Sequence, residues 1–167
     1  GFIIGFDSDP PSIFDRLSEF IKESGIVTAM VGLLNAPRGT RLYQRLKKEG
    51  RLLGSISGDN TDFSLNFIPK MNKEILINGY KKILDTIYSP KHYYERVRTF
   101  LRAYVPPKKK LFHFRFNYIA AFIRSIIVLG IIGKERFHYW RLLLWTVISR
   151  PRLIPQAVTL SIYGFHF

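Results

Sequence analysis

Residues 1–34 read GFIIGFDSDPPSIFDRLSEFIKESGIVTAMVGLL, and this stretch decides the fold. Residues 1–6 and 26–34 are apolar runs, typical of strands that are buried on both faces of a parallel sheet. Between them, Asp9 before Pro10 predicts the start of a helix, and Gly25 predicts its end. Strand, helix and strand in this order predict a right-handed parallel βαβ unit.

A further helix follows this unit. Thr40 is typical of a residue that caps a helix start, and Gly50 is typical of a helix end, so the predicted order is βαβα. Two parallel strands are not stable alone, because each edge would expose unpaired backbone groups. Residues 1–53 are therefore expected to belong to a larger sheet or barrel. The chain begins at Gly1, inside an apolar run and without methionine, so we expect it to be a piece of a longer protein.

The pattern changes after residue 53. Residues 54–70 are polar with little periodicity and are predicted to form a linker loop, and residues 71–167 are predicted to form a helical domain. The predicted fold class is α+β and predominantly helical: a βαβα remnant of a parallel (β/α) barrel followed by a basic helical domain. The helices are expected to begin after Asn72 and Ser89, to cover 114–132 and 135–149, and to break between Pro151 and Pro155 before a short last helix.

The charge is distributed unevenly. The chain has 26 basic and 12 acidic residues and a net charge of +14, and residues 71–167 hold seventeen of the basic residues and four of the acidic ones. This half also contains 18 of the 25 aromatic residues. A basic, aromatic surface fits an anionic partner, which could be lipid headgroups, nucleic acid or an acidic domain. A solvated basic face without a partner is the alternative.

Two motifs carry a family resemblance. GFIIGFDSD at residues 1–9 follows a strand pattern Gly-x-Ile-x-Gly-x-x-Glu, although Ser8 stands where Glu is usual. Pro-Arg-Gly-Thr at residues 37–40 follows a Pro-Gly-Thr turn with an inserted Arg, and Glu49-Gly50 follows the end of the next helix. In this order, on a βαβα unit, they resemble the fifth and sixth strands of a radical S-adenosylmethionine (SAM) barrel.

The second half extends the resemblance. SGDNTDFSLNFIPKMNKEILINGYKKILDTIYSPKHYYERV at residues 57–97 and the terminal GFHF are similar to the linker and helical C-terminal domain of cobalamin-binding radical SAM proteins. That branch includes hopanoid methylases and members whose tail is a domain of unknown function. The resemblance implies a parent enzyme with SAM, a [4Fe–4S] cluster and cobalamin, and it implies the upstream barrel and cobalamin modules as partners.

The resemblance also implies which residues contact the cofactor. Ile3 and Gly5 match the fifth strand, and Leu33, Leu34 and Asn35 match the end of the sixth, where they would lie against the adenine of SAM. The alternative is that Ile3 and Leu33 are barrel core and that Gly5 relieves crowding. The chain has no cysteine and therefore no thiolate for a cluster, so we expect it to be inactive alone.

No catalytic or metal-binding residue is predicted. The order of Asp59, Asn60 and Asp62 superficially resembles a calcium loop, but it lacks the required glycine and the distant glutamate, so turn chemistry is favoured. The four histidines are far apart in the sequence and include no pair at a helical metal-binding interval. They are His92, His113, His138 and His166.

The apolar stretch at residues 116–132 raises the question of a membrane. It is short for a span and has Arg124 in its middle, so a core helix or an in-plane interfacial helix is favoured. We expect a cytoplasmic protein, and a peripheral position on an anionic membrane surface stays open. Two rival functions stay open: a non-catalytic module that binds a membrane surface or a lipid substrate, and a basic helical module that binds nucleic acid, which ranks lower.

Overall fold

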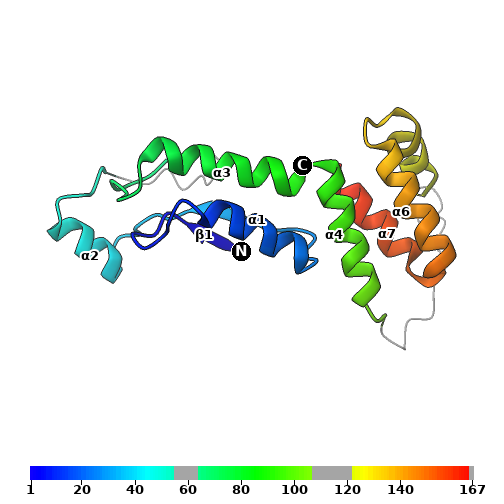
Figure 1. The fold of residues 1–167 in the computed structure, drawn as a ribbon, viewed down its shortest axis with the longest axis horizontal. Helices are drawn as coiled ribbons and strands as arrows, with labels where there is room; N and C mark the ends of the chain where they lie inside the picture. Colours follow the sequence, from blue (N-terminus) through cyan, green and yellow to red (C-terminus); the bar gives the residue numbers. More distant parts are fainter. Residues whose placement is uncertain (55–63, 107–121, 166–167) are drawn as a thin grey trace. The chain divides into compact units, whose positions relative to one another are not determined.

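The computed structural model describes residues 1–54, 64–106 and 122–165 (Figure 1). These residues are mostly helical, with two short parallel strands that alternate with helices, which confirms the predicted fold class. They form two compact units: residues 1–20 and 28–86 belong to the first, and residues 21–27 and 87–167 belong to the second.

The first unit contains the parallel sheet. Strand β1 (Phe2–Ile4) pairs with β2 (Val31–Leu33), and the register places Ile3 opposite Gly32. Helix α1 (Ile13–Glu23) lies between the strands in the sequence. The parallel βαβ order is therefore confirmed, while both strands are shorter than the apolar runs that predicted them.

Helix α1 begins later than predicted because Asp9 has another role. Its Oδ2 accepts hydrogen bonds from the backbone N–H groups of Gly5 and Phe6, at 2.9 and 3.0 Å, and so closes the turn after β1. Gly25 follows the helix with a φ of +67°, as expected of a helix end. Within this helix the side chains of Phe14 and Ile21 are buried, whereas that of Phe20 is exposed.

Helix α2 (Arg41–Lys48) has the boundaries that the sequence predicts. The Thr40 Oγ1 accepts a hydrogen bond from the backbone N–H of Tyr43 at 3.2 Å, and Gly50 follows with a φ of +68°. The buried Leu46 of this helix packs in a cluster that includes Leu34. The helix is thereby fixed to the carboxyl end of β2.

Helix α3 (Lys73–Tyr88) lies along α1 and the strands in the first unit (Figure 1). Asn72 caps it, because the Asn72 Oδ1 accepts hydrogen bonds from two backbone N–H groups of its first turn. The Tyr80 hydroxyl donates to the Val31 carbonyl at 3.1 Å, so α3 contacts β2 directly. Gly79 lies against the ring of Phe14, which allows α3 to approach α1 closely.

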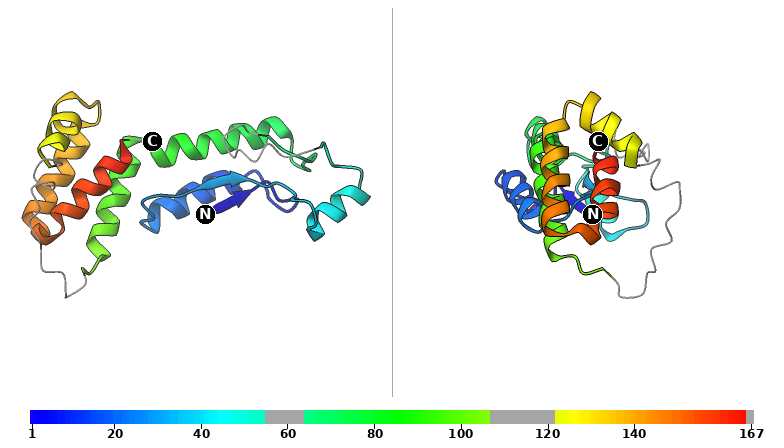
Figure 2. Two further views of the ribbon diagram at one scale, coloured as in Figure 1. Left: turned by 180° about the vertical axis from the view of Figure 1, so that it is seen from behind. Right: turned by 90° about the vertical axis from the view of Figure 1, so that its right-hand side faces the viewer.

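The second unit is helical, and Figure 2 shows α6 and α7 beside α4. Its core contains Tyr93, Val97 and Leu101 of α4 together with buried side chains of α6 and α7. The predicted break at Pro151 and Pro155 is confirmed as a 3-10 turn. The elements are α4 (Pro90–Ala103), the π-helix η1 (Ile126–Ile132), α6 (Arg136–Ser149), the 3-10 helix η2 (Pro151–Leu153) and α7 (Ile154–Gly164).

Several predictions fall on residues outside the described ranges. They concern the middle of the linker, the start of the apolar helix, and single residues, namely Asp59, Asn60, Asp62, His113 and His166. The domain boundaries at 1–53, 54–70 and 71–167 stay a prediction. Among the described residues, none of the helices has the length and apolar character to cross a bilayer, and no group of three or more His, Asp or Glu side chains could hold a metal ion.

Candidate functional site

The two-stranded sheet has one buried face and one open face. Ile4 is 1% exposed and its register partner Leu33 is 8% exposed, whereas Ile3 is 56% exposed. Side chains alternate across a strand, so Ile3 and its partner Gly32 share the face opposite to Ile4. A β-carbon added at Gly32 would meet no atom within 4 Å. The face around Ile3 and Gly32 is therefore open in the described structure.

The carboxyl ends of the two strands meet at Gly5 and Leu34. The Leu34 N–H donates to the Ile4 carbonyl at 2.8 Å, which extends the pairing beyond β2. Gly5 has a φ of +100°, and an added β-carbon would lie 3.2 Å from the Leu76 Cδ2 of α3. Glycine is needed here both for the backbone conformation and for the close approach of α3.

Asn35 anchors the end of β2 to a distant segment. Its Oδ1 accepts from the backbone N–H of Asn66 at 3.1 Å, and its Nδ2 donates to the Ser64 carbonyl at 3.4 Å. Asn66 in turn bonds both backbone groups of Ala36, with its Oδ1 2.8 Å from the Ala36 nitrogen and its Nδ2 2.7 Å from the carbonyl oxygen. This reciprocal arrangement satisfies backbone groups that would otherwise be buried without partners.

Five residues are predicted to contact SAM, namely Ile3, Gly5, Leu33, Leu34 and Asn35. All five residues lie in the strands or directly after them, and Ile3 presents its side chain on the open face. Leu33 and Leu34 are buried, and the Asn35 amide is engaged with residues 64–66. Contact of these residues with SAM stays a prediction.

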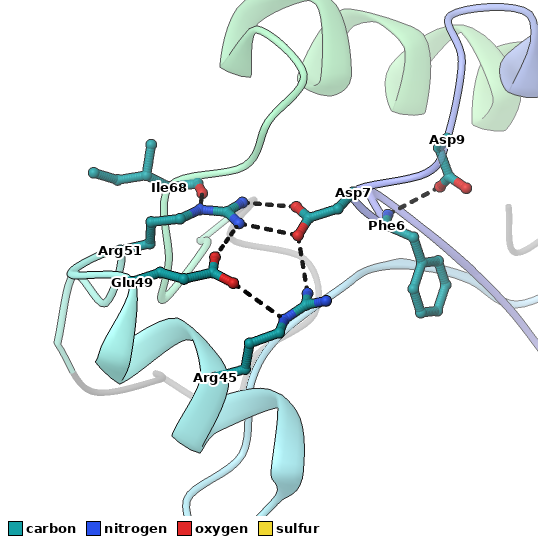
Figure 3. A network of polar contacts seen from close by, with 7 residues as sticks. All are labelled: Phe6, Asp7, Asp9, Arg45, Glu49, Arg51 and Ile68. Atoms are coloured by element: carbon teal, nitrogen blue, oxygen red, sulfur yellow. Dashed lines mark hydrogen bonds and ion pairs between the residues drawn. The ribbon is translucent and has the colours of Figure 1, made fainter.

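An ion-pair network fixes the loop after β1 (Figure 3). The Arg51 guanidinium binds both carboxylate oxygens of Asp7 at 2.7 and 2.9 Å, and the Arg45 Nη2 lies 2.9 Å from the same carboxylate. Arg51 also binds the Glu49 carboxylate at 2.8 Å and donates through Nε to the Ile68 carbonyl. The hydrogen bond from Arg51 holds the pKa of Asp7 below its usual value.

The network joins segments that are far apart in the sequence. Asp7 follows β1, and Arg51 follows α2, 44 residues later. The side chains of Asp7 and Arg51 are 14% and 15% exposed, so solvent screens this pair less than an ordinary surface pair. Neither residue is predicted from the sequence, in which the available signal is a carboxylate directly after a buried strand.

Arg96 is a buried cation in the second unit. Its side chain is 1% exposed, and its Nε and Nη2 donate to the carbonyls of Ile26 and Val27 at 2.9 and 3.2 Å. Burial lowers the pKa of Arg96. These bonds fix the turn after α1 to α4, which is a structural role.

Comparison with known proteins identifies a family that this chain matches. The profile of a domain of unknown function, DUF4070, matches residues 40–167. An uncharacterized methyltransferase of Synechocystis sp. is 31% identical over 171 residues, which cover 100% of this chain and 32% of the relative. Hopanoid C-2 methylase of Rhodopseudomonas palustris is 27% identical over 157 residues, which cover 89% of this chain and 28% of the relative. No solved structure matches the chain.

Proposed function

The chain belongs to the DUF4070 family, and from this premise we propose that it forms the C-terminal part of a radical SAM methylase, whose barrel its first strands complete. Both curated relatives are methylases or methyltransferases by name, and the chain spans about a third of their length. The activity is therefore proposed for a longer protein, in which the upstream barrel and a cobalamin module precede this chain. The helical domain that the sequence predicts at residues 71–167 would shape the substrate site or dock the enzyme.

The observation that supports this proposal is the open face of the two-stranded sheet. In a parallel (β/α) barrel the helices cover the outer face of every strand, and the other face lines the interior. Here one face of β1 and β2 is buried, while Ile3 is exposed beside the bare backbone of Gly32. A sheet of two parallel strands with one open face is what the last βα units of a barrel would leave if taken alone.

The open face suits the adenine ring of SAM. An apolar side chain next to a glycine offers a flat surface that a planar ring can approach closely. Ile3 and Gly32 would provide that surface, and the Asp7–Arg51 ion pair would hold the loop that follows β1. When bound, SAM supplies the activated methyl group. The chain contains no cysteine, so it does not fit a [4Fe–4S] cluster, and we assign cluster binding to the upstream modules.

A matched pair of substitutions tests the proposal in the longer protein. Ile3 and Leu53 are both 56% exposed and both belong to the first unit, but only Ile3 lies on the open face. Ile3→Glu is expected to weaken SAM binding at least tenfold by equilibrium dialysis, because it places a charge against an apolar ring. Leu53→Glu should stay within about twofold of the unsubstituted protein.

The fold of both variants can be checked by circular dichroism. The proposal fails if Ile3→Glu binds SAM as tightly as Leu53→Glu while both variants are folded. It also fails if the longer protein carries no cluster-binding cysteine loop upstream of this chain.

A further inference from the structure

Helix α6 is apolar on both of its faces. Its inner face is buried in the second unit and includes Tyr139 and Leu142. On the outer face, Phe137, Leu144 and Ile148 are 74%, 57% and 81% exposed. They follow one another at intervals of seven and four residues, which places them on one side of the helix. Exposed apolar side chains that gather on one side of a helix are typical of an interaction surface, so this outer face indicates a partner.

Arginine side chains flank this outer face. The guanidinium carbons of Arg98 and Arg102 on α4 lie 5.0 and 5.7 Å from the centre of the Trp145 ring on α6. Arg141 lies one turn before Trp145 on the same side of the helix. Burial, and then the charges of Arg102 and Arg141, lower the pKa of Arg98. Arg98 and Arg102 therefore share one aromatic ring, and their like charges repel each other.

No carboxylate within the described ranges pairs with these arginines. The Nε of Arg98 is buried and has no hydrogen-bond partner among the residues that the structure describes. The sequence explains the lack of counter-charges, because residues 96–167 contain thirteen basic residues and one acidic residue. An anion supplied from outside would relieve the repulsion between these cations.

We propose that this face of α6 docks on an anionic lipid bilayer, with Phe137, Leu144 and Ile148 in the headgroup–acyl boundary and the arginines on the lipid phosphates. Interfacial helices bind through this combination of apolar burial and attraction to anionic lipid. The aliphatic centre of the face favours lipid over nucleic acid, because Leu144 and Ile148 cannot stack on bases. The proposal does not depend on SAM binding by the first unit.

Vesicle binding by the full 167-residue chain tests the proposal. The chain has two tryptophans, Trp140 and Trp145, and both belong to α6, so their fluorescence reports on this helix. Vesicles of phosphatidylcholine mixed with phosphatidylglycerol should sediment the chain and shift its emission to the blue. Vesicles of phosphatidylcholine alone should bind far less, and added salt should release the chain from the mixed vesicles.

Charge variants locate the contact. Arg102→Gln with Arg141→Gln should weaken partitioning about 30-fold, since each basic residue near the surface contributes about fivefold. The control is Lys47→Gln with Lys48→Gln on α2, which makes the same change of net charge at exposed positions of the first unit. This control should weaken partitioning by no more than about twofold.

Apolar variants complete the test. Leu144→Gln with Ile148→Gln should weaken partitioning at least about tenfold, because the apolar burial is lost. Met30→Gln with Leu53→Gln alters two exposed apolar residues of the first unit and should have little effect. Three results would overturn the proposal: equal binding to neutral and anionic vesicles, equal losses in the α6 and control variants, or binding to an RNA oligonucleotide but to no vesicle.

Discussion

Replacing Asp7 by Asn should destabilise the chain by about 2 kcal/mol. Asp7 accepts two hydrogen bonds from Arg51 and one from Arg45, and its side chain is 14% exposed. Hydrogen bonds to charged groups contribute about 1.5–3 kcal/mol each in mutational series, and their losses are not additive. Asparagine keeps the shape, but it removes the charge and directs amide hydrogens at a guanidinium. The loss corresponds to about a 30-fold change in the unfolding equilibrium.

Asp15→Asn is the matched control. Asp15 forms an ion pair with Lys82 at 2.7 Å, as short as the Asp7–Arg51 contact, but these side chains are 71% and 63% exposed. Solvent screens such a pair, so its loss should cost less than about 0.5 kcal/mol. Urea unfolding at neutral pH measures both variants. If Asp15→Asn destabilises the chain as much as Asp7→Asn, burial does not decide the strength of these pairs and the reasoning is refuted.

The same substitution has a defined pH dependence. The pKa of Asp7 is lowered in the folded chain from an ordinary value of 3.8, chiefly by the hydrogen bond from Arg51. A carboxyl with a lowered folded pKa stabilises the fold above its unfolded pKa and loses that contribution as the pH falls through its folded pKa. The stability difference between the unsubstituted chain and Asp7→Asn should therefore be full at neutral pH and should shrink below about pH 4.

Three further predictions concern single residues and the whole chain. Gly79→Ala should lower the melting temperature, because its β-carbon would lie 2.5 Å from the Phe14 ring, whereas Gly32→Ala, with no atom within 4 Å, should leave it nearly unchanged. Arg96→Met should destabilise the chain by about 3 kcal/mol in urea, since the Ile26 and Val27 carbonyls lose their donor, and an unchanged midpoint would contradict this. The chain reconstituted with iron and sulfide should show no thiolate-cluster absorbance, because it has no cysteine; an oxygen-sensitive chromophore would contradict this.

The sequence correctly predicts where α2 and α3 begin, because the capping side chain lies directly before each helix. Thr40 and Asn72 act on N–H groups two or three residues ahead, so their sequence neighbourhood contains both donor and acceptor. Asp9 has the same capacity, but its carboxylate bonds backwards to Gly5 and Phe6, and the helix begins without it. When backbone N–H groups lie within reach both before and after such a side chain, the sequence alone does not show which of them it will bind.

Long-range contacts were beyond sequence reasoning. Arg51 meets Asp7 across 44 residues, and Arg96 meets the Ile26 carbonyl across 70 residues. No spacing rule links such residues, because the fold brings them together only after the chain has packed. The charge asymmetry indicates a basic second half. It does not predict that Arg98 and Arg102 gather around Trp145, because that contact depends on how α4 packs against α6.

Amide hydrogen exchange of the longer protein, with and without SAM, tests most directly whether this chain lines the cofactor pocket. If it does, SAM should slow exchange in Phe2–Gly5 and in Val31–Asn35, the strands and their carboxyl ends, and leave α4, α6 and α7 unchanged. Unchanged exchange in both strands at saturating SAM, or protection confined to the helices of the second unit, would contradict the proposed role.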